Sequence, residues 1–257
     1  MTTHSEHDVL DTLAAVSLDE LVALAELQTR RDRKYAVPRS ALATLVAATP
    51  LGTRVLAIDD RRTFHYESVY FDTVDLTCYF GAARRRPQRF KVRTRTYLDS
   101  AESMLEVKTR DARGRTVKQR HPYHHEHRAV LTDEARAFVA GIDQAHEVAT
   151  NLRETLTTNY RRATLLLPDG ARVTIDVNLS WRHRDGRAIA CPALALVETK
   201  SSGQPSAVDR LLWRAGHRPT VFSKYCTGLA AITSDLPSNK WHRTLQRHFN
   251  GAETDEH

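Results

Sequence analysis

The stretch RFKVRTRTYLDSAESMLEVKTRDARGRTVKQRH, residues 89–121, decides the fold. Three runs within it, 89–97, 104–110 and 115–121, alternate between two kinds of side chain, and side chains two residues apart project from the same face of a strand. Asp99-Ser100 and Arg113-Gly114 are turn signals between these runs. We therefore predict three consecutive antiparallel strands.

Each predicted strand has a charged face and an apolar face. In the first run Lys91, Arg93 and Arg95 alternate with Phe90 and Val92. The later runs have the same pattern, and their charged positions are Glu106, Lys108, Lys118 and Arg120. A half-buried sheet with a solvated polar side is the ordinary explanation of such alternation. Here, however, bases dominate, whereas surface charge is usually mixed in sign.

Further strands are predicted over 67–72, 159–167, 171–179 and 193–200. Helical patterns precede, separate and follow the strand groups: a capping box at Ser17–Glu20, then 40–48, 131–156, a helix from Ser206, and Trp241, Leu245 and Phe249 at four-residue spacing. This order indicates an α+β fold, a closed antiparallel β-barrel of about eight strands with helices outside it and at both termini. If helices cover the apolar faces, the charged faces line the lumen.

We expect three segments along the chain: an acidic helical segment over 1–29, the barrel over 30–233, and an amphipathic helix with an acidic tail over 234–257. The net charge of +7 conceals an asymmetry, because residues 27–250 hold all 38 bases and 22 of the 31 acids. An excess of +16 in this part predicts a polyanionic partner.

Several other functions are excluded or disfavoured by the sequence. It has neither GxxxxGK[ST] nor GxGxxG, which excludes the common phosphate-binding loops. HPYHHEH (121–127) lacks metal-ligand spacing and is predicted to be an exposed loop. The basic strands lack interleaved aromatic residues, so nucleic acid is not an expected partner. Because there is no signal peptide, no membrane-spanning stretch and no paired cysteine pattern, we expect a cytoplasmic protein.

At these strands the chain resembles the polyphosphate polymerase domain of the vacuolar transporter chaperone (VTC) family, within the triphosphate tunnel metalloenzymes. The resemblance extends from about Arg30 to Phe249. The motifs that carry it are RKYAVP (33–38), ESVYFDT (67–73), KVRTRTY (91–97), LEVKTR (105–110), TVKQR (116–120), NYRR (159–162), RVTID (172–176), VETK (197–200) and FSKY (222–225).

The resemblance implies an eight-stranded tunnel that binds ATP and a growing polyphosphate with Mn²⁺ or Mg²⁺. It implies a metal-binding role for Glu198 and substrate contacts from Lys91, Glu106 and Asp176. The basic residues that it assigns to catalysis are Lys34, Arg93, Arg95, Lys108, Lys118, Arg120, Arg162, Arg172, Lys200 and Lys224.

The chain departs from the wider superfamily at one point. The superfamily opens with Glu-x-Glu-x-Lys, whereas here the first acid position is Arg30 and the second is Asp32, before Lys34. Loss of an acid argues against a dedicated two-metal triphosphatase.

The sequence therefore predicts a metal-dependent polyphosphate polymerase that transfers the γ-phosphoryl group of ATP to a phosphate chain. The alternatives are an inorganic triphosphatase and a polyphosphate or nucleotide sensor without turnover. Some members of the family carry membrane spans, which are not expected in this chain, so coupling to transport would need a separate membrane-protein partner.

Overall fold

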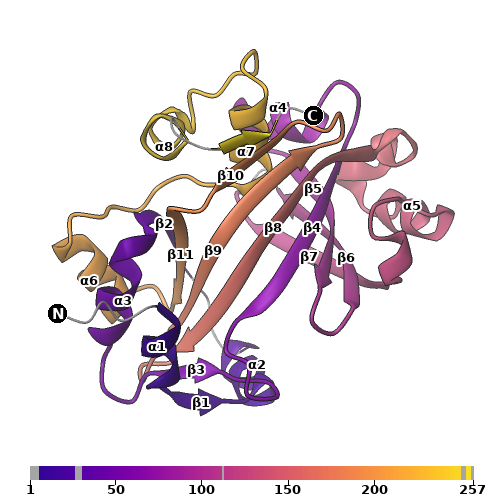
Figure 1. The fold of residues 1–257 in the computed structure, drawn as a ribbon. Coiled ribbons are helices and arrows are strands. Elements are labelled where there is room, and N and C mark those ends of the chain that lie inside the picture. The colour runs from indigo at the N-terminus through magenta and orange to yellow at the C-terminus, as the bar shows by residue number, and fades with distance from the viewer. Residues whose placement is uncertain (1–5, 27–30, 112, 250–252, 256–257) are drawn as a thin grey trace. The chain divides into compact units, whose positions relative to one another are not determined.

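The computed structural model describes residues 6–26, 31–111, 113–249 and 253–255 (Figure 1). The contacts between residues divide the chain into two units. The first comprises 1–64, 160–179 and 191–222, and the second comprises 65–159, 180–190 and 223–257. Strands β8 (Arg153–Leu166) and β9 (Arg172–His183) contribute residues to both units.

The first unit surrounds a sheet in the order β2, β11, β9, β8, β3, β1. The pairs β2–β11, β11–β9 and β8–β3 are antiparallel, whereas β1 and β3 are parallel. Apart from its parts of β8 and β9, its elements are α1 (Glu6–Asp11), β1 (Ala14–Val16), α2 (Leu18–Glu26), β2 (Arg31–Pro38), the 3₁₀ helix η1 (Arg39–Ala41), α3 (Leu42–Ala47), β3 (Arg54–Leu56), β11 (Leu194–Ser201) and α6 (Ala207–Arg214).

The second unit is built on an antiparallel sheet in which β8, β4, β5, β6 and β7 are successive neighbours. Short strands β10 and β12 pair with each other at another edge. The elements of this unit are β4 (Phe64–Asp72), α4 (Thr77–Ala83), β5 (Arg89–Tyr97), β6 (Glu102–Arg110), β7 (Thr116–Tyr123), η2 (His125–His127), α5 (Asp133–Ala140), η3 (Asp143–Asn151), β10 (Ala188–Cys191), α7 (Lys224–Ile232), α8 (His242–His248) and β12 (Glu253–Asp255).

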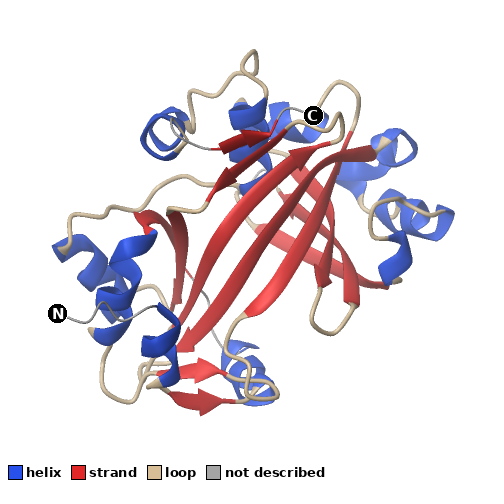
Figure 2. Cartoon of the chain, viewed as in Figure 1, coloured by secondary structure: helices blue, strands red, loops and turns tan. Residues whose placement is uncertain are grey.

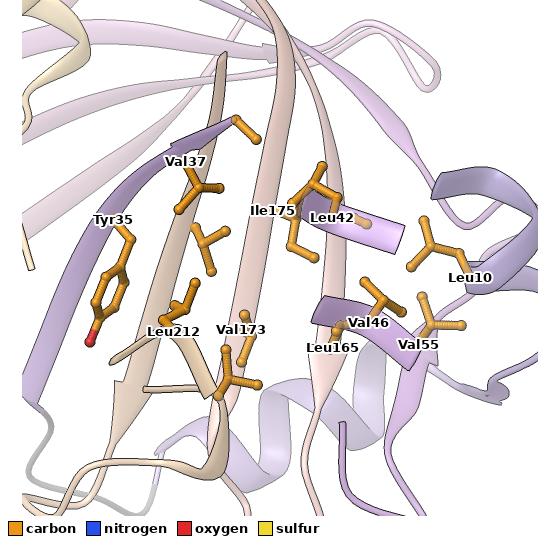
Figure 3. Close-up of a cluster of buried hydrophobic side chains, with 14 of the residues drawn as sticks. Leu10, Tyr35, Val37, Leu42, Val46, Val55, Leu165, Val173, Ile175 and Leu212 are labelled. Carbon is orange, nitrogen blue, oxygen red and sulfur yellow. The ribbon is translucent and has the colours of Figure 1, made fainter. Parts of the chain in front are cut away.

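Alternate residues of the first unit's strands form an apolar core together with its helices (Figure 3). Tyr35 of β2 and Ile175 of β9 lie on either side of Val197 of β11, and Leu212 of α6 belongs to the same cluster. Burying each such side chain contributes roughly 1.5–3 kcal/mol. The intervening residues of these strands therefore project from the opposite face of the sheet.

The strands of the second unit also have one buried face and one charged face. Thr94 and Leu105 belong to the buried face of β5 and β6, and Thr94 Oγ1 donates a hydrogen bond to the Arg128 carbonyl oxygen at 2.6 Å. The His121 ring stacks on Phe138 of α5, with ring centroids 5.1 Å apart. Helices thus cover the face opposite Arg93, as the alternation predicted (Figure 2).

Aromatic residues fix α4 and α7 in the same unit. Tyr225 stacks on Tyr70 at 5.1 Å, and its hydroxyl donates to Asp72 at 2.6 Å. Asp72 also accepts hydrogen bonds from the backbone N–H groups of Cys78 and Tyr79 at the start of α4. A buried carboxylate with this many donors ties β4 to both helices.

The α+β fold with a large antiparallel sheet is confirmed, and a closed barrel is not. Among the described strands, β7 pairs with β6 alone and β2 pairs with β11 alone, so hydrogen bonds do not close the sheet.

The prediction of helix up to residue 156 was wrong, because β8 begins at Arg153. Its Thr-rich start favours a strand that is paired on both sides. The described helices contain none that is long and apolar enough to cross a membrane.

Candidate functional site

The strand register sorts the charged residues of the second unit into rows. Arg93 lies opposite Glu106, which lies opposite Arg120 on the next strand. The following row holds the bases Lys91, Lys108 and Lys118. Since residues directly opposite each other lie on one face, the structure brings these five predicted bases and one predicted acid together.

Glu106 is the centre of this face. Its side chain is 3% exposed, and both Nε and Nη2 of Arg93 donate to Oε2, at 2.8 and 2.6 Å. Oε1 lies 2.6 Å from Lys118 Nζ and 3.3 Å from Arg120 Nε. Arg93, Lys118 and Arg120 therefore contact the same carboxylate. Through these contacts Glu106 ties side chains of the two flanking strands, β5 and β7, to β6.

The charge states of this cluster follow from burial and from these contacts. Burial acts to raise the pKa of Glu106, but Arg93, Arg95 and Lys118 outweigh it and hold that pKa well below its usual range. Burial lowers the pKa of Lys118 to about 8, against the attraction of Glu106. The face is thus a permanent carboxylate surrounded by bases, one of which titrates near neutral pH.

Tyrosines on β4 support the arginines. Tyr70 Oη accepts a hydrogen bond from Arg93 Nη1 at 3.0 Å, and the Arg93 guanidinium lies 5.7 Å from the Tyr70 ring centroid. Arg95 lies at the same distance from the Tyr66 ring. The sequence reasoning missed these tyrosines, although the period of two in 64–72 puts them opposite Arg93 and Tyr97.

Two buried polar atoms on this face have no hydrogen-bond partner among the described residues: Ser68 Oγ and Arg95 Nε. They belong to residues that lie directly opposite each other on β4 and β5. A buried donor without a partner is costly, and an anion oxygen would satisfy both groups.

The FSKY segment joins the same face through α7. Lys91 Nζ donates to Ser223 Oγ at 2.8 Å, and this oxygen also caps α7 by accepting from the Cys226 N–H. Lys224 is the first residue of the helix, and its carbonyl oxygen accepts from Trp181 Nε1 at 2.8 Å. A Cβ on Gly228 would overlap the Trp181 ring, so glycine allows α7 to pack this closely.

The first unit carries the remaining predicted residues on the face opposite its apolar core. Lys34 lies opposite Glu198, and Glu198 lies opposite Thr174. In the next row Lys200 lies opposite Asp32 on one side and opposite Arg172 on the other. Lys200 Nζ is 3.0 Å from Glu198 Oε1 and 3.6 Å from Asp32 Oδ2.

Asp176 and Arg162 form a bidentate pair on this second face. Arg162 Nε and Nη2 donate to the two carboxylate oxygens at 2.6 and 2.8 Å, and the guanidinium lies 5.3 Å from the Tyr160 ring centroid. Such paired geometry fixes the orientation of the guanidinium as well as its position. Asp176 is therefore a positioning partner of Arg162.

Glu198 is ionised despite its burial. Burial acts to raise its pKa, but Lys34, Lys200 and Arg162 together hold it well below the usual range. Its side chain keeps 22% exposure.

The donor set fits a divalent cation in one specific way. Among the described residues no group of three or more His, Cys, Asp or Glu side chains could hold a metal by itself. Mg²⁺, however, is commonly bound through one or two carboxylates and substrate phosphates, with waters completing its shell. The ionised Glu198 fits such a site, and phosphate would offset the surrounding bases.

The charged strand faces in both units carry an excess of bases that carboxylates orient, and such faces favour phosphate-rich anions. The VTC domain matches residues 29–233, and the chain belongs to this family. The membership supports a function related to polyphosphate or triphosphate.

Comparison with solved structures finds weak similarities. HpAC1 from Hippeastrum, for which a dominant triphosphatase activity is described, is 13% identical with a TM-score of 0.48, over 82% of this chain and 100% of that one. PH1819 from Pyrococcus horikoshii OT3 is 9% identical with a TM-score of 0.42, covering 76% and 94% of the two chains. PH1012 from the same organism is 11% identical with a TM-score of 0.36, covering 73% and 88%. No curated protein matches the chain.

Proposed function

We propose that this protein is a metal-dependent polyphosphate polymerase that transfers the γ-phosphoryl group of ATP to a growing phosphate chain. The observation that carries the proposal is the arrangement around Glu106. One buried carboxylate orients Arg93, Lys118 and Arg120, while the row beside it adds two further bases, Lys91 and Lys108. A face built in this way has positive charge left over for a polyanion.

Phosphoryl transfer needs this kind of site more than it needs a side-chain nucleophile. The barrier falls when the donor and acceptor oxygens are held in line and the charge on the transferring oxygens is neutralised. Arg93 and Arg95, held by Glu106, Tyr70 and Tyr66, supply fixed guanidinium groups whose orientation is set before substrate arrives. Fixed groups need no reorganisation during the reaction.

In the first unit, Arg162 and Arg172 would bind further phosphate groups, and Lys34 and Lys200 would flank the metal-binding carboxylate of Glu198. Mn²⁺ or Mg²⁺, when bound there, supplies charge neutralisation at the phosphate oxygens. Lys108, Lys118, Arg120 and Lys224 are proposed as further contacts to the phosphate chain, with Lys91, Glu106 and Asp176 as supporting residues.

The closed barrel also belongs to this proposal, and it rests on the resemblance to tunnel enzymes rather than on the strand pairing. A separate membrane-protein partner is also part of this proposal, and it would be needed if synthesis is coupled to transport.

Incubation with ATP and Mn²⁺ or Mg²⁺, followed by gel analysis of phosphate chains, tests the function. A ladder of long chains is the expected product. Release of inorganic phosphate from triphosphate without chain growth would instead identify a triphosphatase, and tight binding without turnover would identify a sensor. The Arg93→Gln variant should lose chain synthesis, whereas Arg210→Gln on α6 should retain it, because Arg210 donates to the Pro205 carbonyl oxygen outside both charged faces.

A further inference from the structure

The charged face of the second unit continues past the residues assigned to catalysis. Arg89 and Arg110 lie directly opposite each other, one row beyond Lys91, Lys108 and Lys118. The turn after α4 and the segment before α8 add further bases. We call these residues the basic rim: Arg84, Arg85, Arg86, Arg89, Arg110 and Lys240.

Backbone oxygens, not carboxylates, accept from two side chains of the rim. Arg89 Nη1 donates to the Arg86 carbonyl oxygen at 2.6 Å, and Lys240 Nζ donates to the Ala82 carbonyl oxygen at 2.8 Å. Within the described part of the chain, no carboxylate lies within ion-pair distance of a rim residue. The side chains of Arg89 and Lys240 are therefore held in place, and ion pairs within the described residues do not compensate the charge of the rim.

These charges repel one another. Like charges directly opposite on neighbouring strands destabilise a sheet. Burial, and after it Arg110, holds the pKa of Arg89 below its ordinary value, and burial together with Arg89, Lys91 and Arg85 does the same for Lys240. A bound anion would relieve this repulsion.

Arg85 occupies a left-handed position within the rim. It has a φ of 54° in the turn that ends α4, where its N–H donates to the Ala82 oxygen and the Arg86 N–H donates to the Gly81 oxygen. Glycine is the usual residue at this left-handed position, because any side chain there is strained. Substitution by glycine would remove this strain while also removing one charge of the rim.

We propose that the basic rim binds a polyphosphate chain beyond the segment held at the catalytic face, so that the enzyme holds long chains more tightly than triphosphate. The inference rests on the proposed function and specifies its ligand as an extended bare polyphosphate. The rim offers no free ring for stacking nucleic-acid bases, because Arg84 lies 4.7 Å from the Phe80 ring centroid and Trp241 is buried. Among the described residues 77–91 and 236–244, no large apolar side chain is exposed that could enter a membrane.

Two variants of the full-length protein test the rim. In Arg89→Gln/Arg110→Gln the affinity for long-chain polyphosphate should fall about tenfold, on the basis of about threefold for each charge removed. The affinity for tripolyphosphate should stay within about twofold. In Arg85→Gly, long-chain affinity should fall about threefold while the melting temperature stays equal or rises, because glycine removes the strain. A variant that is more stable and binds less tightly cannot be explained by misfolding.

The matched control is Arg210→Gln/Arg214→Gln on α6, which also removes two bases that donate to backbone oxygens. Titration calorimetry with tripolyphosphate and long-chain polyphosphate gives both affinities. Equal losses in the rim and control variants would overturn the inference, as would a selective loss of binding to single-stranded DNA or anionic vesicles in the rim variants. In either case wild-type chain synthesis would still be observed. Failure of the proposed function would instead show as a wild-type protein that makes no chains.

Discussion

Lys118 Nζ lies 2.6 Å from Glu106 Oε1, and the two groups respond to burial in opposite ways. The carboxylate is ionised throughout the physiological range, because three bases outweigh its desolvation. The amine has a pKa of about 8, because burial and the neighbouring Arg95 and Arg120 disfavour its charge. One pair thus combines a fixed charge with a titrating one.

This relationship predicts a pH dependence of ligand binding. A bound polyanion favours the protonated amine, so triphosphate affinity should fall as pH rises from about 8 towards the ordinary value of 10.5. Binding above pH 8 should take up protons, which calorimetry in buffers of different ionisation enthalpy detects. Lys118→Arg keeps its charge, and its affinity should stay constant over this window. An equal fall in both proteins would assign the effect to another group.

The lowered pKa of Lys118 also affects the stability of the protein without ligand. Between pH 8 and 10.5 the unfolded state binds more protons at Lys118 than the folded state does, so this residue makes stability rise with pH. Glu106 acts in another range: its contribution is present above its ordinary pKa of 4.5 and is lost as pH falls below it. Chemical denaturation as a function of pH, compared with Lys118→Arg, measures the first effect.

Glu106→Gln should destabilise the empty protein by roughly 2 kcal/mol. Removing one partner of a fully buried ion pair costs about 3–5 kcal/mol, and the loss is smaller here because Arg93 and Lys118 keep partial exposure. Saturating triphosphate should restore much of this loss by replacing the missing negative charge. A variant that is destabilised equally with and without triphosphate would contradict a ligand-binding role for this face.

Glu198→Gln should separate catalysis from binding. The amide keeps the size of the side chain but removes the charge that a hard divalent cation prefers. Turnover should drop by orders of magnitude while triphosphate binding survives in part, measured by single-turnover assays and calorimetry across a Mn²⁺ titration. Wild-type turnover at saturating Mn²⁺ would reduce Glu198 to an ion-pair partner of Lys200.

Thermal stability should distinguish triphosphate from other anions. A ligand at about 100 times its dissociation constant adds roughly 2.7 kcal/mol to the stability of the folded state. For a chain of this length the melting temperature should rise by about 5–10 °C. Single phosphate should have a weak effect because it cannot reach several strands at once, and single-stranded DNA serves as the control. Equal stabilisation by DNA would indicate an open basic surface in place of a phosphate-specific site.

Relief of repulsion gives a last test. Lys108 lies opposite both Lys91 and Lys118, and like charges in this arrangement oppose folding. Lys108→Ala should therefore raise the melting temperature of the empty protein slightly while reducing the shift caused by triphosphate. Arg93→Ala should lower it instead, because Glu106 and Tyr70 would each lose a partner. If Lys108→Ala also lowered it, packing of the lysine stem would outweigh the repulsion.

The sequence by itself determined the strands that carry the charges and the face on which each charge lies. A period of two leaves no freedom about which side chains share a face, so the order of residues alone places Lys91, Arg93 and Arg95 together. The register between neighbouring strands then determined which charges lie opposite each other, which the pattern within one strand does not contain. The turns set this register, so that Glu106 lies opposite Arg93 and Arg120 while Lys108 lies opposite two other lysines.

Only the tertiary structure decided which groups hold these charges in place. Tyr70 reaches Arg93, Ser223 reaches Lys91, and the Ala82 oxygen reaches Lys240 across 23, 132 and 158 residues of chain. It also decided the secondary structure of residues 153–158. Their threonines favour a strand only where neighbouring strands pair with them, and β8 has such neighbours. Hydrogen bonds and burial between distant segments have no periodic signature, and this is why the charged faces could be predicted whereas their supports and the strain at Arg85 could not.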